Sequence, residues 1–266
     1  MPHAATSNLK FDKPENPAHV INGQGQSRVL LVCEHASNHI PARYAGLGLT
    51  KAAKISHAAW DPGAQAISER ISALLDAPLV VSKVSRLVYD CNRPPTSTGA
   101  IRAVSEQVIV PGNDALTTAE QKERVETVYE PFTQTVTDTI KSFKAAPILV
   151  TIHSYTRIYN DHTRDVDVGI IHDADARLSH VMVELSGKAL GLRYALNEPY
   201  SKADEVAHTL ELHATKNGLI NVMIEVCNDL LETPEQQDAI AWMLADLLTA
   251  SLSSMDVDMS QKGSSC

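Results

Sequence analysis

Three strand-like runs of this sequence end in residues that could do chemistry. The runs, with the polar residues that follow them, are 29–33 with Glu34-His35, 147–152 with His153, and 219–224 with Glu225. In open α/β sheets, ligands gather beyond the carboxyl ends of the strands, so we expect these side chains to meet at one edge of a sheet. A single polar residue at a strand end often only caps the sheet or bonds a loop. Two histidines and a carboxylate together indicate a functional site.

Two histidines and a carboxylate from separate strand ends, with one position left open, form the usual ligand set of a catalytic zinc. Zinc lowers the pKa of a bound water to near neutrality and polarises a carbonyl group. A nearby carboxylate can then take the proton and pass it to a leaving amine. The residues therefore predict metal-dependent hydrolysis of an amide.

Other catalytic classes have less support in the sequence. A serine hydrolase of the Gly-x-Ser-x-Gly type is not indicated, because that pattern does not occur. Ser154 would also point to the opposite side of an extended strand from His153. Neither Gly-x-Gly-x-x-Gly nor Gly-x-x-x-x-Gly-Lys occurs, so a dinucleotide or ATP enzyme is not indicated either.

A helix is predicted over residues 61–75. Asp61 suits its N-cap, Pro62 suits the first helical position, and apolar residues follow at helical spacing. Asp61 could serve only as this cap. A carboxylate at a helix start can also reach a cation at the sheet edge, so the second role stays open.

Arg86 and Arg93 flank a short apolar segment that is braced by Pro94 and Pro95. Such a segment suits a rigid holder for a substrate carboxylate, because a guanidinium group makes two parallel hydrogen bonds to a carboxylate. The alternative is a pair of surface salt bridges. Further along, His213 lies close to the last strand in sequence and could serve the site or simply pack.

The elements that must position these residues alternate between strands and helices. Residues 78–83 and 168–171 are predicted as two further strands. Further helices are predicted over 117–144, with an interruption near Pro131, over 175–190, with Gly191 as the stop, and over 234–251. This alternation predicts a three-layer α/β domain.

Length and composition set the broad class of protein. With 266 residues, 44% of them hydrophobic, we expect a single domain over 28–254, an irregular leader over 1–27 and a frayed tail over 255–266. A net charge of -9 without a basic run argues against nucleic acid as a partner. No segment approaches the roughly 20 apolar residues that span a bilayer, and the N-terminus lacks a signal-peptide pattern. A cytoplasmic protein of open oligomeric state is expected.

Several longer motifs resemble those of one known family. They are Glu34–Pro41, Ser85–Pro94, His153–Tyr155, Thr209–Ala214 and Ile224–Leu230. In this order, over about residues 28 to 250, they resemble the N-formylglutamate amidohydrolase family, which is related to the zinc carboxypeptidases. The resemblance implies a phosphorylase/hydrolase-like fold, a three-layer α/β/α arrangement with a mixed central sheet. It also implies a Zn²⁺ cofactor and hydrolysis of N-formyl-L-glutamate to formate and L-glutamate.

The resemblance also implies roles for residues. By position, His35 and His153 become metal ligands and Glu225 the general base, with His213 as the next candidate for catalysis. The carboxypeptidases have a glutamate ligand three residues after the first histidine, where this chain has Asn38. The third ligand must then come from elsewhere, with Asp61 favoured and Glu34 the alternative.

The substrate site follows from the same resemblance. The Asn-Arg carboxylate clamp of the carboxypeptidases is similar to Asn92-Arg93, and with Arg86 and Tyr155 these residues are expected to bind the substrate. An arginine is common in the family where this chain has Cys227, which leaves the exact acyl-amino-acid substrate open.

The main expectation is therefore a metal-dependent amidohydrolase for a small anionic N-acyl amino acid. The alternatives are a deacylase for another N-acyl amino acid or a small peptide, and a non-catalytic relative that only binds a ligand or metal. A pure binder has no need of Glu225 opposite the histidines, so the sequence favours an enzyme.

Overall fold

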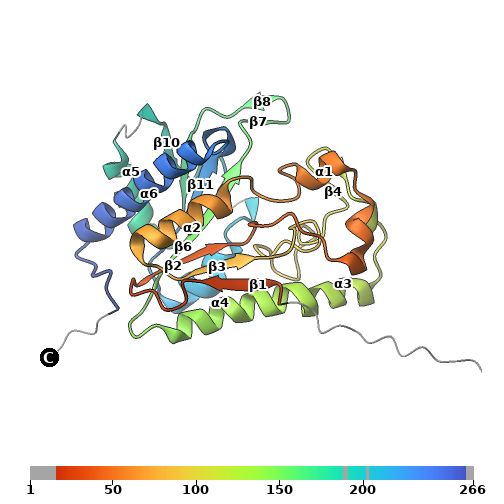
Figure 1. The fold of residues 1–266 in the computed structure, drawn as a ribbon, viewed down its shortest axis with the longest axis horizontal. Helices are drawn as coiled ribbons and strands as arrows, with labels where there is room; N and C mark the ends of the chain where they lie inside the picture. The colour runs from red at the N-terminus through yellow and green to blue at the C-terminus, as the bar shows by residue number, and fades with distance from the viewer. Residues whose placement is uncertain (1–15, 188–190, 202–203, 262–266) are drawn as a thin grey trace, which may run out of the picture.

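A computed structural model describes residues 16–187, 191–201 and 204–261 (Figure 1). The strands are β1 Ala18–Ile21, β2 Val29–Cys33, β3 Leu79–Ser82, β4 Val104–Ser105, β5 Val108–Ile109, β6 Ile148–Tyr155, β7 Ile158–Tyr159, β8 His162–Thr163, β9 Val168–Ile171, β10 Tyr194–Leu196 and β11 Asn221–Cys227. The α-helices are α1 Lys51–Ile55, α2 Ala64–Leu75, α3 Thr118–Arg124, α4 Glu130–Ser142, α5 Arg177–Ser186 and α6 Pro234–Ser254.

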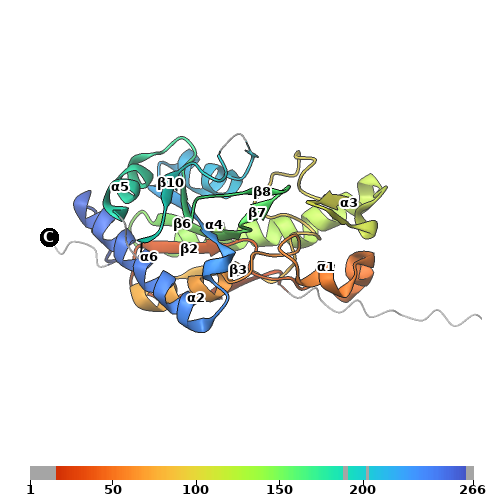
Figure 2. The same ribbon diagram turned by 90° about the horizontal axis from the view of Figure 1, so that it is seen from above.

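Within the described residues, seven strands form one mixed sheet in the order β1-β3-β2-β6-β11-β9-β10. Strands β3, β2, β6 and β11 run parallel to one another, whereas β1 pairs antiparallel with β3 and β9 pairs antiparallel with β11. The edge strand β10 runs parallel to β9. Helices α2, α5 and α6 pack on one face of the sheet, and α4 packs on the other (Figure 2). The three-layer α/β/α fold with a mixed central sheet is confirmed.

The central strands are buried along their whole length. Every residue of β2, β6 and β11 is buried, which explains why these strands are nearly unbroken apolar runs in the sequence. Their register sets the site, because Glu225 pairs beside His153 and Val32 pairs beside Thr151. Glu34 is two residues beyond Val32, so it reaches the same level of the sheet as His153.

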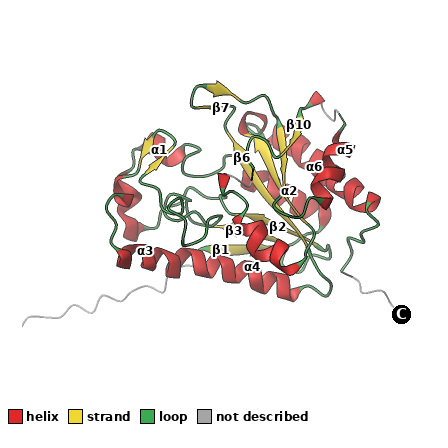
Figure 3. Ribbon diagram, turned by 180° about the vertical axis from the view of Figure 1, so that it is seen from behind, coloured by secondary structure: helices red, strands yellow, loops and turns green. Residues whose placement is uncertain are grey.

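The predicted helix over 117–144 is confirmed as a nearly continuous rod. It begins with a capping box at Thr117, runs through α3, passes a π-helical turn over Val125–Tyr129 and ends with α4. The π turn comes directly before Pro131, where the sequence predicted an interruption. Figures 1 and 3 show this rod running along the edge of the molecule beside β1.

The first helix after β2 begins later than predicted. Helix α2 starts at Ala64, and its N-cap position is occupied by Gly63, so Asp61 does not cap it. Gly63 has φ +83°, a left-handed conformation that glycine adopts readily. This turn frees the Asp61 side chain to point toward the sheet edge.

Substitution of Gly63 by alanine should destabilise the protein strongly. A Cβ at Gly63 would lie 2.5 Å from the Leu231 Cβ, in addition to the strained φ. Gly218 is a matched control, because its φ is +67° but a Cβ there meets nothing within 4 Å. We expect Gly218→Ala to cost about 1–2 kcal/mol of unfolding free energy and Gly63→Ala a further 1–3 kcal/mol or so in urea denaturation. Equal losses in the two variants would show that the contact with Leu231 is unimportant.

Three other boundaries differ from the prediction. Residues 18–21 of the expected irregular leader form β1, an edge strand that pairs with β3. The helix expected to stop at Gly191 ends at Ser186, followed by Gly187 at φ +56°. The tail is not frayed over 255–261, because the Arg28 N–H donates to the Met259 carbonyl and Met259 packs on the core. Residues 262–266 lie outside the described part.

No helix in the described ranges is both long enough and apolar enough to cross a membrane.

Candidate active site

His35, Asp61 and His153 form a buried cluster at the carboxyl ends of β2 and β6. His153 Nδ1 lies 3.2 Å from His35 Nδ1 and 3.0 Å from Asp61 Oδ2, and His35 Nδ1 lies 3.3 Å from the same oxygen. The backbone holds the loops together, because the Asp61 N–H donates to the His35 carbonyl over 3.0 Å. Three potential ligand atoms therefore face one another in a small triangle.

Each histidine of this triangle has a second carboxylate on its outer ring nitrogen. His35 Nε2 lies 2.7 Å from Asp90 Oδ1, and His153 Nε2 lies 3.1 Å from Glu34 Oε2. The His35 contact has hydrogen-bond geometry, and a carboxylate can only accept, so Asp90 places the ring proton of His35 on Nε2 and leaves a lone pair on Nδ1. Carboxylates on the outer nitrogens of histidines are typical of metal sites.

The triangle fits a metal ion. A cation at the centre of the triangle would be attracted by the Asp61 carboxylate and could accept a lone pair from each Nδ1 atom. Tetrahedral ligands about 2.0–2.1 Å from a zinc ion would lie about 3.3 Å from each other, close to the observed spacings of 3.0–3.3 Å. His35, Asp61 and His153 can therefore hold a metal ion. Of the two carboxylates considered for the third ligand, Asp61 is the one in the triangle, and Glu34 lies beside the outer nitrogen of His153.

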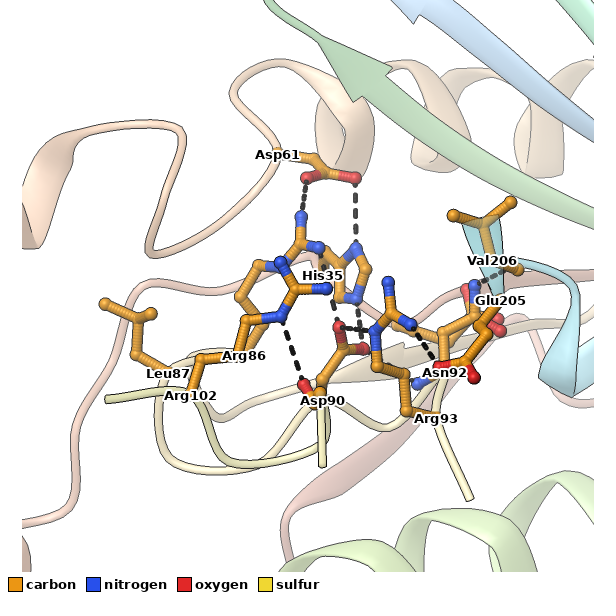
Figure 4. A network of polar contacts seen from close by, with 12 residues as sticks. His35, Asp61, Arg86, Leu87, Asp90, Asn92, Arg93, Arg102, Glu205 and Val206 are labelled. Atoms are coloured by element: carbon orange, nitrogen blue, oxygen red, sulfur yellow. Dashed lines mark hydrogen bonds and ion pairs between the residues drawn. The ribbon is translucent and has the colours of Figure 1, made fainter. Parts of the chain in front are cut away.

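Two positively charged side chains, those of Arg86 and Arg93, lie beside the buried carboxylates Asp61 and Asp90 (Figure 4). Arg86 Nη1 lies 3.1 Å from Asp61 Oδ1, and Arg86 Nη2 lies 3.5 Å from Asp90 Oδ2. Arg93 Nε lies 3.4 Å from the same Asp90 oxygen. Burial opposes the ionisation of Asp90, but His35 and these guanidinium groups outweigh it and hold its pKa well below the ordinary value.

Arg93 is also paired on its other side. Its Nη1 lies 3.2 Å from Glu205 Oε2, and its Nη2 donates to the Asp204 carbonyl over 3.3 Å. The side-chain amide of Asn92 is also hydrogen-bonded to the backbone. Its nitrogen donates to the Val206 carbonyl, and its oxygen accepts from the Thr209 N–H over 3.0 Å. Arg86, Asn92 and Arg93 line the pocket as predicted, but all three already bind protein groups.

Glu225 forms another part of the pocket wall. It projects from β11 beside His153, and its Oε2 atom is buried without a hydrogen-bond partner among the described residues. Burial raises the pKa of Glu225 to about 7. A carboxylate with a raised pKa and an unpaired oxygen suits proton transfer near neutral pH.

The pocket has a volume of about 460 Å³ and extends from the triangle toward two hairpins. The hairpin β4–β5 supplies Ser105 and Glu106, and the hairpin β7–β8 supplies Tyr159 and His162. In Figures 1 and 3 the β7–β8 hairpin projects beyond the end of β6. The hairpins thus form walls above the candidate metal ligands, with room for a small molecule.

Two predicted site residues do not line this pocket. Tyr155 is fully buried, and its hydroxyl donates to the Val166 carbonyl, so it is not free to bind substrate. His213 is also buried and absent from the pocket wall, and burial lowers its pKa to about 4.

Sequence reasoning missed several charged residues of the site, among them Asp90, Arg102 and Arg164. Asp90 was visible inside the motif Ser85–Pro94, but its contact with His35 depends on the loop conformation. Arg102 and Arg164 also line the pocket and belong to irregular segments next to the hairpins. The only available signal was their positive charge in a chain of net charge -9.

A model of the N-formylglutamate amidohydrolase family matches residues 27–232. The chain belongs to this family. The match includes every residue of the triangle, both outer carboxylates and Glu225, so this N-formylglutamate amidohydrolase family member is a hydrolase. No curated protein matches the chain.

Two solved structures are similar to this chain. Gene product Atu2144 from Agrobacterium tumefaciens is 44% identical to this family member, with a TM-score of 0.88 and coverage of 91% of this chain and 97% of that one. The N-formylglutamate amidohydrolase from Ralstonia eutropha JMP134 is 17% identical, with a TM-score of 0.67 and coverage of 91% and 99%. At that identity the second likeness shows a shared fold.

Proposed function

We propose that this chain is a zinc-dependent hydrolase of small N-acyl amino acids, and that its substrate is N-formyl-L-glutamate. The observation that carries the proposal is the triangle of His35 Nδ1, Asp61 Oδ2 and His153 Nδ1, with a carboxylate behind each histidine. The donor set of two imidazoles and one carboxylate suits zinc and leaves a position for water. The family assignment supports the amide as the bond that is broken.

When bound, the metal would supply Lewis acidity toward the water and the acyl oxygen. The remaining chemistry belongs to Glu225. Its carboxylate takes a proton from the water as the oxygen attacks the acyl carbon. It then donates that proton to the amine nitrogen as the C–N bond breaks. The products of N-formyl-L-glutamate would be formate and L-glutamate, and Glu225 returns to its starting protonation state.

The proposal is tested by metal analysis and by formate release. Purified protein should contain close to one zinc per chain, and a chelator should remove both zinc and activity. Zinc should then restore the activity. Formate release from N-formyl-L-glutamate should exceed that from N-formyl amino acids with neutral side chains. A zinc-loaded protein without activity on N-acyl amino acids would overturn the proposed function.

Substitution of Asp90 by asparagine should weaken metal binding without removing a metal ligand. Asp90 Oδ1 holds His35 Nε2 at 2.7 Å and thereby sets which nitrogen of the ring carries the proton. An asparagine can present its NH₂ group to that nitrogen and favour the wrong tautomer. We expect the zinc Kd to rise by about 10- to 100-fold, measured by competition with a chromophoric chelator.

Asp229→Asn is the matched control for this experiment. Asp229 also pairs with an arginine, Arg157, at 2.8 Å, but it does not line the pocket. We expect its zinc Kd to equal that of the parent. Circular dichroism should show that both variants fold. An unchanged zinc Kd in folded Asp90→Asn would exclude Asp90 from tuning the site.

A further inference from the structure

We propose that Arg102 and Arg164 bind the carboxylates of the substrate, in place of Arg86 and Arg93. This inference rests on the proposed function for the identity of the substrate. The two arginines that the sequence predicted to bind substrate already form ion pairs within the protein. Arg86 pairs with Asp61 and Asp90, and Arg93 pairs with Asp90 and Glu205. Withdrawing either one toward a substrate would break its contact with a buried carboxylate, which is costly.

Arg164 is held over aromatic rings instead of against an acid. Its Cζ lies 4.4 Å from the ring centroid of Tyr159, 4.7 Å from that of Tyr200 and 5.5 Å from that of Tyr155. One Nη1 hydrogen bond goes to the Thr156 carbonyl over 3.3 Å. Cation–π contacts fix the guanidinium group without neutralising it, so its charge and remaining N–H donors stay available to the pocket. Tyr155 therefore contacts Arg164 without lining the pocket itself.

Arg102 is held by backbone groups. Its Nε donates to the Gly99 carbonyl over 3.3 Å, which leaves both Nη groups available (Figure 4). Its own carbonyl accepts a hydrogen bond from buried Asn113 at 2.8 Å, and Asn113 in turn accepts from Arg124 at 2.6 Å. This buried network fixes the position from which the Arg102 side chain enters the pocket.

Neither arginine forms an ion pair within the described residues. The other carboxylates of this wall are those of Glu106 and Asp204. The Glu106 Oε1 atom lies 3.8 Å from His57 Nε2, and Asp204 Oδ2 accepts from the Ser201 N–H over 2.8 Å. Among the residues that the structure describes, the pocket therefore has two positive groups without an ion pair of their own.

The positions of the two arginines fit a substrate with two carboxylates. Arg102 precedes β4, and Arg164 follows β8, so they enter the same pocket from the two hairpin walls. An N-acyl amino acid with an acidic side chain carries an α-carboxylate and a side-chain carboxylate. Each can pair with one guanidinium group while the acyl carbon lies at the triangle. Selection for an acidic side chain would then come from residues outside the predicted Asn92-Arg93 clamp.

The test uses Arg102→Gln and Arg164→Gln in the zinc-loaded full chain, assayed on N-formyl-L-glutamate and on N-formyl-L-glutamine. The second substrate keeps the shape of the first but lacks the side-chain charge. For N-formyl-L-glutamate, each variant should lose about 10- to 150-fold in kcat/KM, mainly through KM. For N-formyl-L-glutamine, only the variant that lost the α-carboxylate partner should lose activity. Arg193→Gln is the control, because its side chain is 66% exposed and pairs with Asp165.

Calorimetric binding of glutarate separates this inference from the proposed function. Glutarate has two carboxylates and no amide, so its binding does not require turnover. Loss of glutarate binding in both variants, with normal zinc content and circular dichroism, would support the inference even if the parent hydrolysed no N-acyl amino acid. Parent-like KM values and glutarate binding in both variants would overturn it, even if the parent releases formate.

Discussion

Replacement of Glu225 by glutamine is expected to lower kcat for amide hydrolysis by about 10²–10⁴-fold, the range of general acid–base catalysis. Glutamine keeps the shape of the side chain but cannot take a proton from water. Glu225 is not part of the triangle formed by His35, Asp61 and His153, so the variant should keep its zinc. The measurement is formate release under saturating substrate, together with zinc content of the same sample.

Stability distinguishes a catalytic carboxylate from a structural one at this position. The Glu225 Oε2 atom has no hydrogen-bond partner among the described residues, so removal of its charge breaks no bond of that atom. We therefore expect the unfolding free energy of Glu225→Gln to be at least that of the parent. Glu211→Gln is a control, because Glu211 is a half-exposed carboxylate that pairs with Lys216 away from the pocket. Parent-like turnover in Glu225→Gln, or loss of its zinc, would refute the assignment.

The sequence was sufficient to predict which strand ends meet. Buried parallel strands are recognisable as apolar runs, and their carboxyl ends must share one edge of the sheet. The register then places His153 beside Glu225 and level with Glu34. This part of the site depends only on backbone geometry, which repeats along every strand, and it was therefore predictable.

The irregular segments of the site were less predictable. Asp61 has the residue type of a helix cap and of a metal ligand, and the left-handed turn at Gly63 removes it from the cap position. Arg86 and Arg93 were predicted to bind substrate, but the buried Asp90 lies between them and uses their charge. Loop side chains have no periodicity, so the pairing of particular acids with particular arginines follows only from the folded loop.

The sequence also failed to predict the strand β1 at the edge of the sheet. Strand β1 has only four residues and lies at the sheet edge, where one side needs no apolar neighbour. Its sequence, Ala-His-Val-Ile, therefore lacks the unbroken apolar run that identifies β2 and β6. The misplaced end of α5 has another cause, because Gly187 and Gly191 both have positive φ and both suit a helix stop.

The largest loss is expected from His153→Ala, which should abolish both zinc binding and amide hydrolysis. The substitution removes one of three ligand atoms and leaves Glu34, 3.1 Å from His153 Nε2 in the parent, as a buried carboxylate without its partner. Two ligands from His35 and Asp61 cannot hold zinc in the usual protein coordination, which needs three protein ligands in a catalytic site. Zinc per chain should fall from about one to near zero by elemental analysis.

Loss of folding could also remove the metal, so a second variant is required. In His153→Ala/Glu34→Gln the carboxylate is replaced together with its partner, and no buried charge remains unpaired at that point. This double variant should recover much of the unfolding free energy lost in His153→Ala but none of the zinc or the activity. Recovery of stability without recovery of zinc would assign His153 to the metal and Glu34 to its orientation. Full zinc occupancy in either folded variant would exclude His153 as a ligand.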